Sequence, residues 1–280
     1  MRIRKAAASI SADIDGVDLA DLDSTEFRDI YGAWLEFSVL RIRDQELTKD
    51  ELQGFSQRFG PLEYAPMGNI TPEQLADVPT PFVTNISNII EDGRPIGGLG
   101  SGEANWHTDM SYIERPPTAS ILIAVEVPEV GGDTEYCDMN AAFESLPIGL
   151  SDRARTLSIK HDAAHDSVGN LRRGFDHSLS PVEAPGCVHP MVRRHEETGR
   201  DALFLGRRQD AYIPQMDLDE SEVLLDEIWD YVALEGHSWV QRWRKGDVVM
   251  WDNRSVMHRR MSFRASSRRL MHRTQVRPVI

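Results

Sequence analysis

A β-branched and almost wholly apolar run, Ala119–Val127, limits most strongly what this chain can fold into. A run of this length and composition is typical of a buried strand. Pro128 ends the run and Gly131-Gly132-Asp133 forms a turn, after which Thr134–Asp138 is expected to return as the neighbouring strand. Many further short strands, with helices at the start, in the middle and at the periphery, favour a β-sandwich or jelly roll with helical insertions.

Besides two short helices at Asn140–Leu146 and Ser151–Thr156, three longer helices are predicted, two from their end signals and one from its amphipathic spacing. The first starts at Asp23 and runs to about Glu36. Thr48 and Glu51 have the spacing of a capping box and open a second helix, which stops at Gly60. The third is the amphipathic stretch Asp217–Leu234. Late strands are predicted at Val248–Trp251 and Arg269–Val276.

Composition narrows the class of protein. The 280 residues contain no repeat and no convincing linker, so we predict one domain spanning residues 1–280. A net charge of −14 argues against a nucleic-acid binder, although a local group of arginines can still attract a small anion. No segment approaches the roughly 18 apolar residues of a membrane span. Cys137 and Cys187 are expected to be free thiols, which favours a cytoplasmic protein.

A histidine and an aspartate two residues apart are the first candidates for chemistry. They lie in Trp106-His107-Thr108-Asp109. In an extended segment alternate side chains share a face, so the imidazole of His107 and the carboxylate of Asp109 are expected to project to the same side. Two such donors are part of a 2-His-1-carboxylate triad, which leaves positions on a non-haem Fe(II) open. The pair alone also fits a solvated loop.

The densest glycine segment of the chain, Gly97-Gly98-Leu99-Gly100-Ser101-Gly102, precedes this pair. A loop that cradles phosphate would need a following Gly-Lys-Ser/Thr and a helix, and neither is present. A mobile lid beside the His-x-Asp pair is the preferred interpretation.

Four blocks in a characteristic order give the chain a family resemblance. They are Trp106-His107-Thr108-Asp109, Gly131-Gly132-Asp133-Thr134, Trp251-Asp252-Asn253-Arg254 followed by His258, and Arg268-Arg269-Leu270-Met271-His272-Arg273. Together they resemble the taurine/2,4-D dioxygenase family, and the resemblance covers nearly the whole chain. It implies a mostly β fold with flanking helices, a double-stranded β-helix of the cupin-like jelly-roll kind. It also implies Fe(II) as cofactor and 2-oxoglutarate as cosubstrate.

The resemblance assigns roles to residues of this sequence. It implies that His107, Asp109 and His258 are the catalytic metal ligands. It implies that Arg269 and Thr134 bind the distal carboxylate of 2-oxoglutarate, a task that suits a guanidinium because it binds carboxylates bidentately. Asn253 and Arg254 are assigned to the turn and to support of the site. Arg273, which shares a strand face with Arg269, is implied to meet the acid group of the primary substrate.

The substrate pattern departs from that of taurine-using members. Ala65 and Gly68 stand where those members carry His and Tyr, and Gly206-Arg207 looks more like the 2,4-D branch. The sequence therefore favours an anionic organic acid other than taurine. Arg207 and Arg208 are candidate contacts for it, with a solvated loop as the alternative for both.

The function expected from this resemblance is hydroxylation of a small anionic organic substrate at an unactivated C–H, with use of O₂ and release of succinate and CO₂. A taurine or alkyl sulfate/sulfonate dioxygenase is the first alternative. A cupin-like metal-binding protein without turnover is another, but it has no need for Thr134 and Arg269. A zinc hydrolase would need a general base near the metal, and none is evident. The expected partners are small molecules, with neither nucleic acid nor membrane, and a homo-oligomer is possible.

Overall fold

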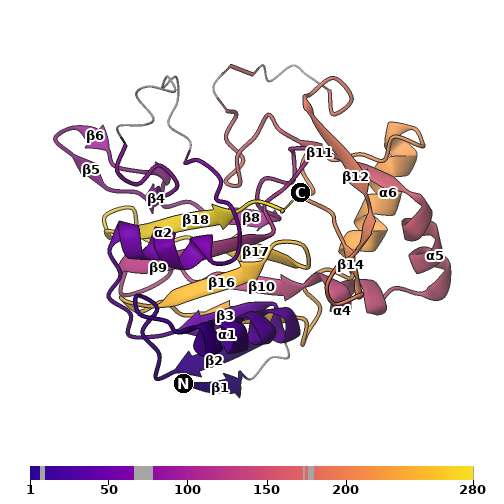
Figure 1. Cartoon of the computed structure of the whole chain (residues 1–280). Helices are drawn as coiled ribbons and strands as arrows, with labels where there is room; N and C mark the ends of the chain where they lie inside the picture. The colour runs from indigo at the N-terminus through magenta and orange to yellow at the C-terminus, as the bar shows by residue number, and fades with distance from the viewer. Residues whose placement is uncertain (7–9, 66–77, 173, 176–179, 280) are drawn as a thin grey trace.

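Two β-sheets packed against each other form the centre of the computed structural model, which describes residues 1–6, 10–65, 78–172, 174–175 and 180–279 (Figure 1). The larger sheet has the strand order β1 (Arg2–Lys5), β2 (Ser11–Asp15), β3 (Val39–Ile42), β16 (Val248–Asp252), β9 (Ala119–Glu126), β18 (Leu270–Val276), β4 (Thr84–Ser87) and β7 (Gly98–Leu99). The smaller sheet has the order β15 (Ser238–Gln241), β10 (Thr134–Asp138), β17 (Val256–Arg260) and β8 (Ala104–His107). The predicted jelly roll is confirmed.

Strand β9 lies at the middle of the larger sheet, antiparallel to β16 and β18. Its first six residues are buried, so the prediction of a buried strand is confirmed. An apolar layer lies between the two sheets and holds them together. In this layer Leu122 and Val249 of the larger sheet pack near Tyr136 and Val256 of the smaller sheet.

The prediction that Thr134–Asp138 pairs with the preceding strand is wrong. Strand β10 instead pairs with β15 and β17 of the smaller sheet. Gly131 and Gly132, at φ 81° and 72°, carry the chain away from β9 in a conformation that only glycine adopts readily, and Gly131 forms a bridge with Phe263. The glycines therefore make a crossing between sheets and not a hairpin. This crossing delivers Thr134 to the inside of the roll.

The capping signals identified the starts of the first two helices correctly, although α2 ends at Gln57, three residues before Gly60. Helix α1 (Ser24–Phe37) starts after Asp23, whose carboxylate accepts hydrogen bonds from the backbone N–H groups of Thr25 and Glu26. Helix α2 (Lys49–Gln57) has the predicted capping box of Thr48 and Glu51. Both helices pack on the outer face of the larger sheet, as Figure 1 shows.

A second group of elements lies at the other end of the roll (Figure 1). It comprises α4 (Met139–Glu144), α5 (Ile148–Thr156), α6 (Leu218–Trp229) and the strand pairs β11 (Ser158–Asp162) with β12 (Gly186–Pro190) and β13 (Val192–Arg194) with β14 (Asp201–Leu203). A further pair, β5 (Ile90–Glu91) with β6 (Arg94–Pro95), lies beside β4. Helix α6 ends five residues before its predicted end.

Two other expectations concern the cysteines and the position of Gly68. Cys137 and Cys187 are both free, as predicted. Gly68 lies outside the described residues. Among the helices that are described, none is long and apolar enough to cross a membrane.

His161 is a buried histidine that belongs to none of the sequence motifs. It is 1% exposed, its ring packs on those of His189 and Phe204, and neither ring nitrogen has a hydrogen-bond partner among the described residues. A Cβ on Gly206 would lie 1.9 Å from its Nδ1, so only glycine fits beside it. Burial, with the charges of neighbouring His189 and Arg193 added to it, holds the pKa of His161 well below its usual value.

This burial predicts a loss of stability in acid. The unfolded chain binds a proton at this histidine below about pH 6.5, whereas the folded chain does not, so stability is full above that pH and falls as pH drops. The free energy of unfolding should fall by up to about 1.4 kcal/mol for each pH unit below 6.5 through this group. Denaturant unfolding of the metal-free protein at several pH values, with His161→Leu beside the wild type, measures it. Equal pH slopes for the two proteins would contradict the prediction.

Candidate metal centre

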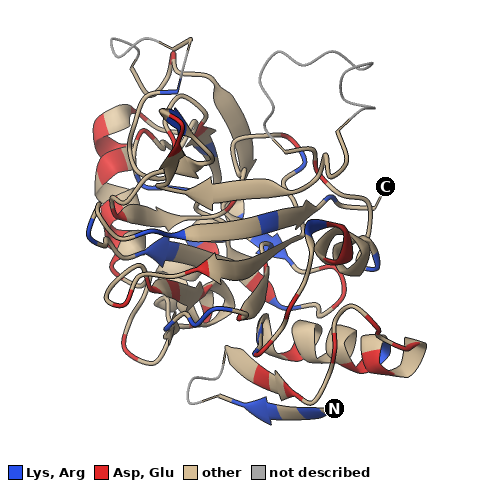
Figure 2. Ribbon diagram, turned by 90° about the vertical axis from the view of Figure 1, so that its left-hand side faces the viewer, with Lys and Arg blue, Asp and Glu red and all other residues tan. Residues whose placement is uncertain are grey.

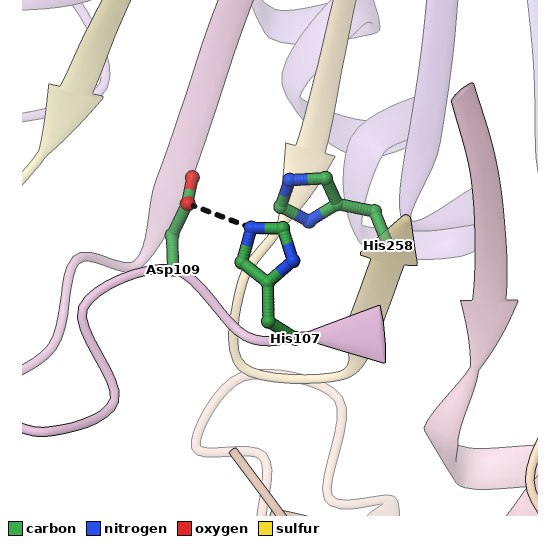
Figure 3. Close-up of side chains that lie close together, drawn as sticks. All are labelled: His107, Asp109 and His258. Atoms are coloured by element: carbon green, nitrogen blue, oxygen red, sulfur yellow. Dashed lines mark ion pairs between the residues drawn. The ribbon is translucent and has the colours of Figure 1, made fainter. Parts of the chain in front are cut away.

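The three predicted metal ligands come together at one end of the roll. One donor atom from each of His107, Asp109 and His258 lies within 4.8 Å of the other two, and all three side chains are buried. His107 ends β8 and pairs directly with His258 on β17, which brings the centroids of the two rings to 4.1 Å. Asp109 follows two residues later and turns its carboxylate toward the His107 ring (Figure 3).

The carboxylate of Asp109 is held from several sides. The hydroxyl of Ser120 donates to its Oδ2 at 2.7 Å, and Arg273 Nη1 lies 3.3 Å from its Oδ1. Asn253 fixes the backbone, because it accepts a hydrogen bond from the Asp109 N–H and donates one to the Asp109 carbonyl, each at 2.9 Å. Burial alone would raise the pKa of Asp109, but the charge of Arg273 holds it well below its usual value. The group is therefore an anionic donor in a fixed orientation.

Both imidazoles are suited to donate a lone pair. His107 Nδ1 lies 2.7 Å from the Asn105 carbonyl, which fixes it as the protonated nitrogen and leaves Nε2 free, 3.7 Å from Asp109 Oδ1. Burial, with repulsion from His107 added to it, lowers the pKa of His258 to about 3. His258 is therefore neutral over the ordinary pH range.

Arg269 is a buried cation that lines the same cavity as His107 and His258. Arg269 is 2% exposed, forms no ion pair with any described residue, and its Nε has no hydrogen-bond partner among them. Thr134 lines the cavity with it and accepts a hydrogen bond from Trp243 Nε1 at 3.0 Å, which leaves its own hydroxyl hydrogen free to donate. Burial, with repulsion from Arg260 added to it, lowers the pKa of Arg269 to about 9. The charge and the hydrogen-bond donors of these groups suit an anion.

We call the space between these two groups the metal cavity. It is lined, among others, by His107, Thr134, His258, Arg260, Arg269 and Arg273. The structure thus brings both predicted 2-oxoglutarate contacts and the predicted substrate contact to the same space as two of the three ligands. The cationic lining contrasts with the net charge of −14, and Figure 2 shows Lys and Arg positions on strands inside the molecule and acidic positions on peripheral helices.

The structure does not bring the paired arginines to this cavity. Arg208 forms ion pairs at 2.6 Å with Glu222 and Asp226 of α6 on the surface. Arg207 is buried but donates to the backbone carbonyls of Asp162 and Asp166, which holds the chain that follows β11. Their role as substrate contacts therefore has no geometric support.

Two residues of the site were missed at the sequence level. Ser120 was included only as part of the strand β9, and nothing in its context marks it as a partner of Asp109. Arg260 lies two residues after His258, and because side chains at i and i+2 of a strand share a face, this spacing was a usable signal. It was overlooked because the resemblance assigns the position no role.

Comparison with known proteins identifies the family. The model of the family described as "Taurine catabolism dioxygenase TauD, TfdA family" matches residues 2–275. The chain belongs to this family. An (S)-phenoxypropionate/alpha-ketoglutarate-dioxygenase of Sphingobium herbicidovorans is 32% identical over 96% of this chain and 92% of the relative. An alpha-ketoglutarate-dependent 2,4-dichlorophenoxyacetate dioxygenase of Cupriavidus pinatubonensis is 35% identical over 94% of this chain and 93% of the relative.

Solved structures agree with this membership. A taurine dioxygenase from Burkholderia xenovorans, 28% identical, superimposes with a TM-score of 0.77 over 100% of this chain and 91% of that one. AAD-2 in complex with Mn(II) and N-oxalylglycine, 26% identical, gives a TM-score of 0.80 over 100% of this chain and 98% of that one. The chain is a 2-oxoglutarate-dependent dioxygenase that uses Fe(II).

The residues present fit both groups that the family requires. His107, Asp109 and His258 form the nitrogen and oxygen donor set that suits a divalent first-row metal, and they would hold the iron. The unpaired guanidinium of Arg269 and the hydroxyl of Thr134 would hold a carboxylate of 2-oxoglutarate. When bound, iron and 2-oxoglutarate supply O₂ activation, with release of succinate and CO₂. The chain supplies orientation, charge and exclusion of water.

The bonds of Asn253 to Asp109 predict a measurable effect on metal binding. Asn253→Ala should free the Asp109 backbone and weaken Mn(II) binding by about 10–100-fold, as is usual for groups that orient a ligand. Asn140→Ala is the matched control, because Asn140 is also a buried asparagine but bonds to Asp201 away from the site. Calorimetric titration of the metal-free wild type and of both variants with Mn(II) measures the three affinities. Equal Mn(II) affinity in both variants would contradict the prediction.

Proposed function

We propose that the chain hydroxylates a small organic acid at an unactivated C–H and that Arg273 binds the acid group. The observation that carries the proposal is the position of Arg273 at the junction of two spaces. It lines the metal cavity and also an outer cleft of about 800 Å³. A substrate in the cleft could thus place its anionic group on Arg273 while it faces the metal ligands.

The lining of the outer cleft indicates what else the substrate contains. Much of the lining is apolar or aromatic: Val78, Val83, Ile86, Ile96, Leu99 and Tyr112. Lys49 and Arg172 add positive charge, and Asp166 is the one carboxylate among the described residues of the lining. A body of apolar atoms with one acidic group fits this combination best.

The names of the relatives support the same class of substrate. Two of them act on phenoxypropionate and 2,4-dichlorophenoxyacetate, which are carboxylic acids with an aromatic body. An alkylsulfatase of Acinetobacter baylyi, 29% identical over 92% of this chain, and the structural similarity to a taurine dioxygenase keep sulfates and sulfonates as the alternative.

The roles of the chain's residues in the reaction follow from their positions. Arg269 and Thr134 would anchor 2-oxoglutarate at one side of the metal cavity, and Arg273 would anchor the substrate at the other. Arg273 lies 3.3 Å from Asp109 Oδ1 and compensates its charge. With a metal held by His107, Asp109 and His258, the guanidinium of Arg273 would be available to the substrate's acid group.

The variant Arg273→Ala distinguishes the role of Arg273 in substrate binding from the role of Arg269 in 2-oxoglutarate binding. Loss of a charge-assisted contact to a buried carboxylate costs on the order of 2–5 kcal/mol, so turnover of the acid should fall tens-fold or more. Consumption of 2-oxoglutarate without substrate should change far less, because Arg269 is intact. Arg268→Ala is the control, since Arg268 pairs with Glu126 on the surface. Measuring succinate with and without the acid tests the assignment, and an equal loss of both activities would count against it.

The substrate class itself is tested by coupled succinate release. Aryloxy and alkyl carboxylates should stimulate succinate formation above the substrate-free rate, and their uncharged amides should not. Stimulation by sulfonates or sulfates alone would replace the carboxylic-acid proposal with the alternative.

A further inference from the structure

Arg260 is a buried arginine next to the metal centre for which the family resemblance gives no role. It lies on β17 two residues after His258, is 6% exposed, and forms no ion pair with a described carboxylate. Its Nη2 donates to two backbone carbonyls, that of Leu99 at 2.9 Å and that of Gly102. Burying a guanidinium on two neutral acceptors is costly, so the position calls for a functional explanation.

Both carbonyls belong to the glycine-rich segment Gly97–Gly102. One end of this segment, β7, pairs in parallel with β4 at the edge of the larger sheet. Gly97 packs so closely there that a Cβ would lie 2.6 Å from the Asn85 carbonyl. Toward the other end, Ser101 accepts a hydrogen bond from the Phe263 N–H at 3.3 Å. Arg260 thus adds two bonds to the segment, one at Leu99 within β7 and one at Gly102 next to Ser101.

Leu99 is the residue through which the segment reaches the site. Its side chain lines both the metal cavity and the outer cleft. Its φ of 73° is a strained conformation for a residue other than glycine, and surrounding contacts must hold it. The bond from Arg260 to the Leu99 carbonyl is one such contact. A shift of this carbonyl would move a residue that lines both spaces.

Arg260 also adds positive charge beside Arg269. The two guanidinium groups lie 5.7 and 5.9 Å from the centroid of the same Phe263 ring. Across the sheet, Arg260 pairs in register with Thr134. An anion held by Arg269 and Thr134 would therefore lie near the Arg260 charge as well.

We propose that Arg260 is a positioning residue for 2-oxoglutarate binding. Arg260 fastens the segment Gly97–Gly102 to β17, the strand that carries His258, so that Leu99 closes the metal cavity. The proposal rests on the 2-oxoglutarate dependence of the family and not on the identity of the primary substrate. An arginine suits the position because its planar fork is fixed in orientation on a long side chain.

Arg259 provides a matched control on the same strand. It is adjacent in sequence and points to the opposite face, where it pairs with Glu135 at 2.7 Å and stacks over Trp106. Arg260→Met and Arg259→Met therefore each remove one arginine from β17, and only the first removes the bonds to the segment.

The first measurement is amide hydrogen exchange of the metal-free proteins. In Arg260→Met the amides of residues 98–102 should exchange at least tenfold faster than in the wild type, whereas β9 and β16 keep their protection. In Arg259→Met the segment should exchange within twofold of the wild type. Unchanged exchange of the segment in Arg260→Met would overturn the proposal.

The second measurement is calorimetric binding of N-oxalylglycine to the Mn(II)-loaded proteins. The dissociation constant should rise at least tenfold in Arg260→Met and stay within twofold in Arg259→Met. Wild-type affinity in Arg260→Met would overturn the proposal. Weaker binding with unchanged exchange would also overturn it, because Arg260 would then act through charge alone.

Arg260→Lys keeps the test decisive where the methionine variant fails to fold. The lysine retains the charge but lacks the rigid fork, so segment exchange should rise and N-oxalylglycine affinity should fall several-fold. A lysine variant with both properties at the wild-type level would overturn the proposal.

Discussion

The buried charge of Arg269 is the constraint on which the rest of the site depends. A guanidinium removed from water costs several kcal/mol unless an anion compensates it, and no described carboxylate pairs with this one. The chain therefore holds a buried cation at a position that suits an anionic ligand. The dianionic cosubstrate of the family would supply that anion. Folding alone does not explain an arginine in this place, whereas ligand binding does.

The jelly roll sets the distance between this charge and the metal ligands. His107 and His258 face each other on β8 and β17 of the smaller sheet, and Arg269 immediately precedes β18 of the larger one. A ligand between the sheets can therefore touch a metal on one side and a cation on the other. The core layer between the sheets keeps both ends rigid, as pre-organised binding requires.

Much of this architecture could be predicted because local chemistry determined it. The apolar run of β9, the caps at Asp23 and Thr48 and the motif blocks around the metal ligands each carry their own signal. The pairing of β10 could not be predicted, because a Gly-Gly turn is compatible with a hairpin and with a crossing between sheets. Only the packing of the sheets distinguishes the two.

The groups that the arginine side chains contact could not be predicted from the sequence either. Arg208 and Arg260 are both arginines near a recognised motif, yet one forms ion pairs on the surface and the other is buried in the cavity. The choice depends on carboxylates and carbonyls that are distant in sequence, such as Glu222 and Leu99. The same holds for Ser120, whose hydroxyl meets Asp109 only after β9 takes its place in the sheet.

The central claim is that the metal ligands and the charge of Arg269 act together on one dianion. Thermal unfolding of the wild type and of Arg269→Met, with Mn(II), with N-oxalylglycine and with both, tests it most directly. A ligand that binds the folded state raises the midpoint. For the wild type we predict a rise with both ligands that exceeds the sum of the two separate rises, and for Arg269→Met we predict that this excess is largely lost. An excess of equal size in the two proteins would contradict the account.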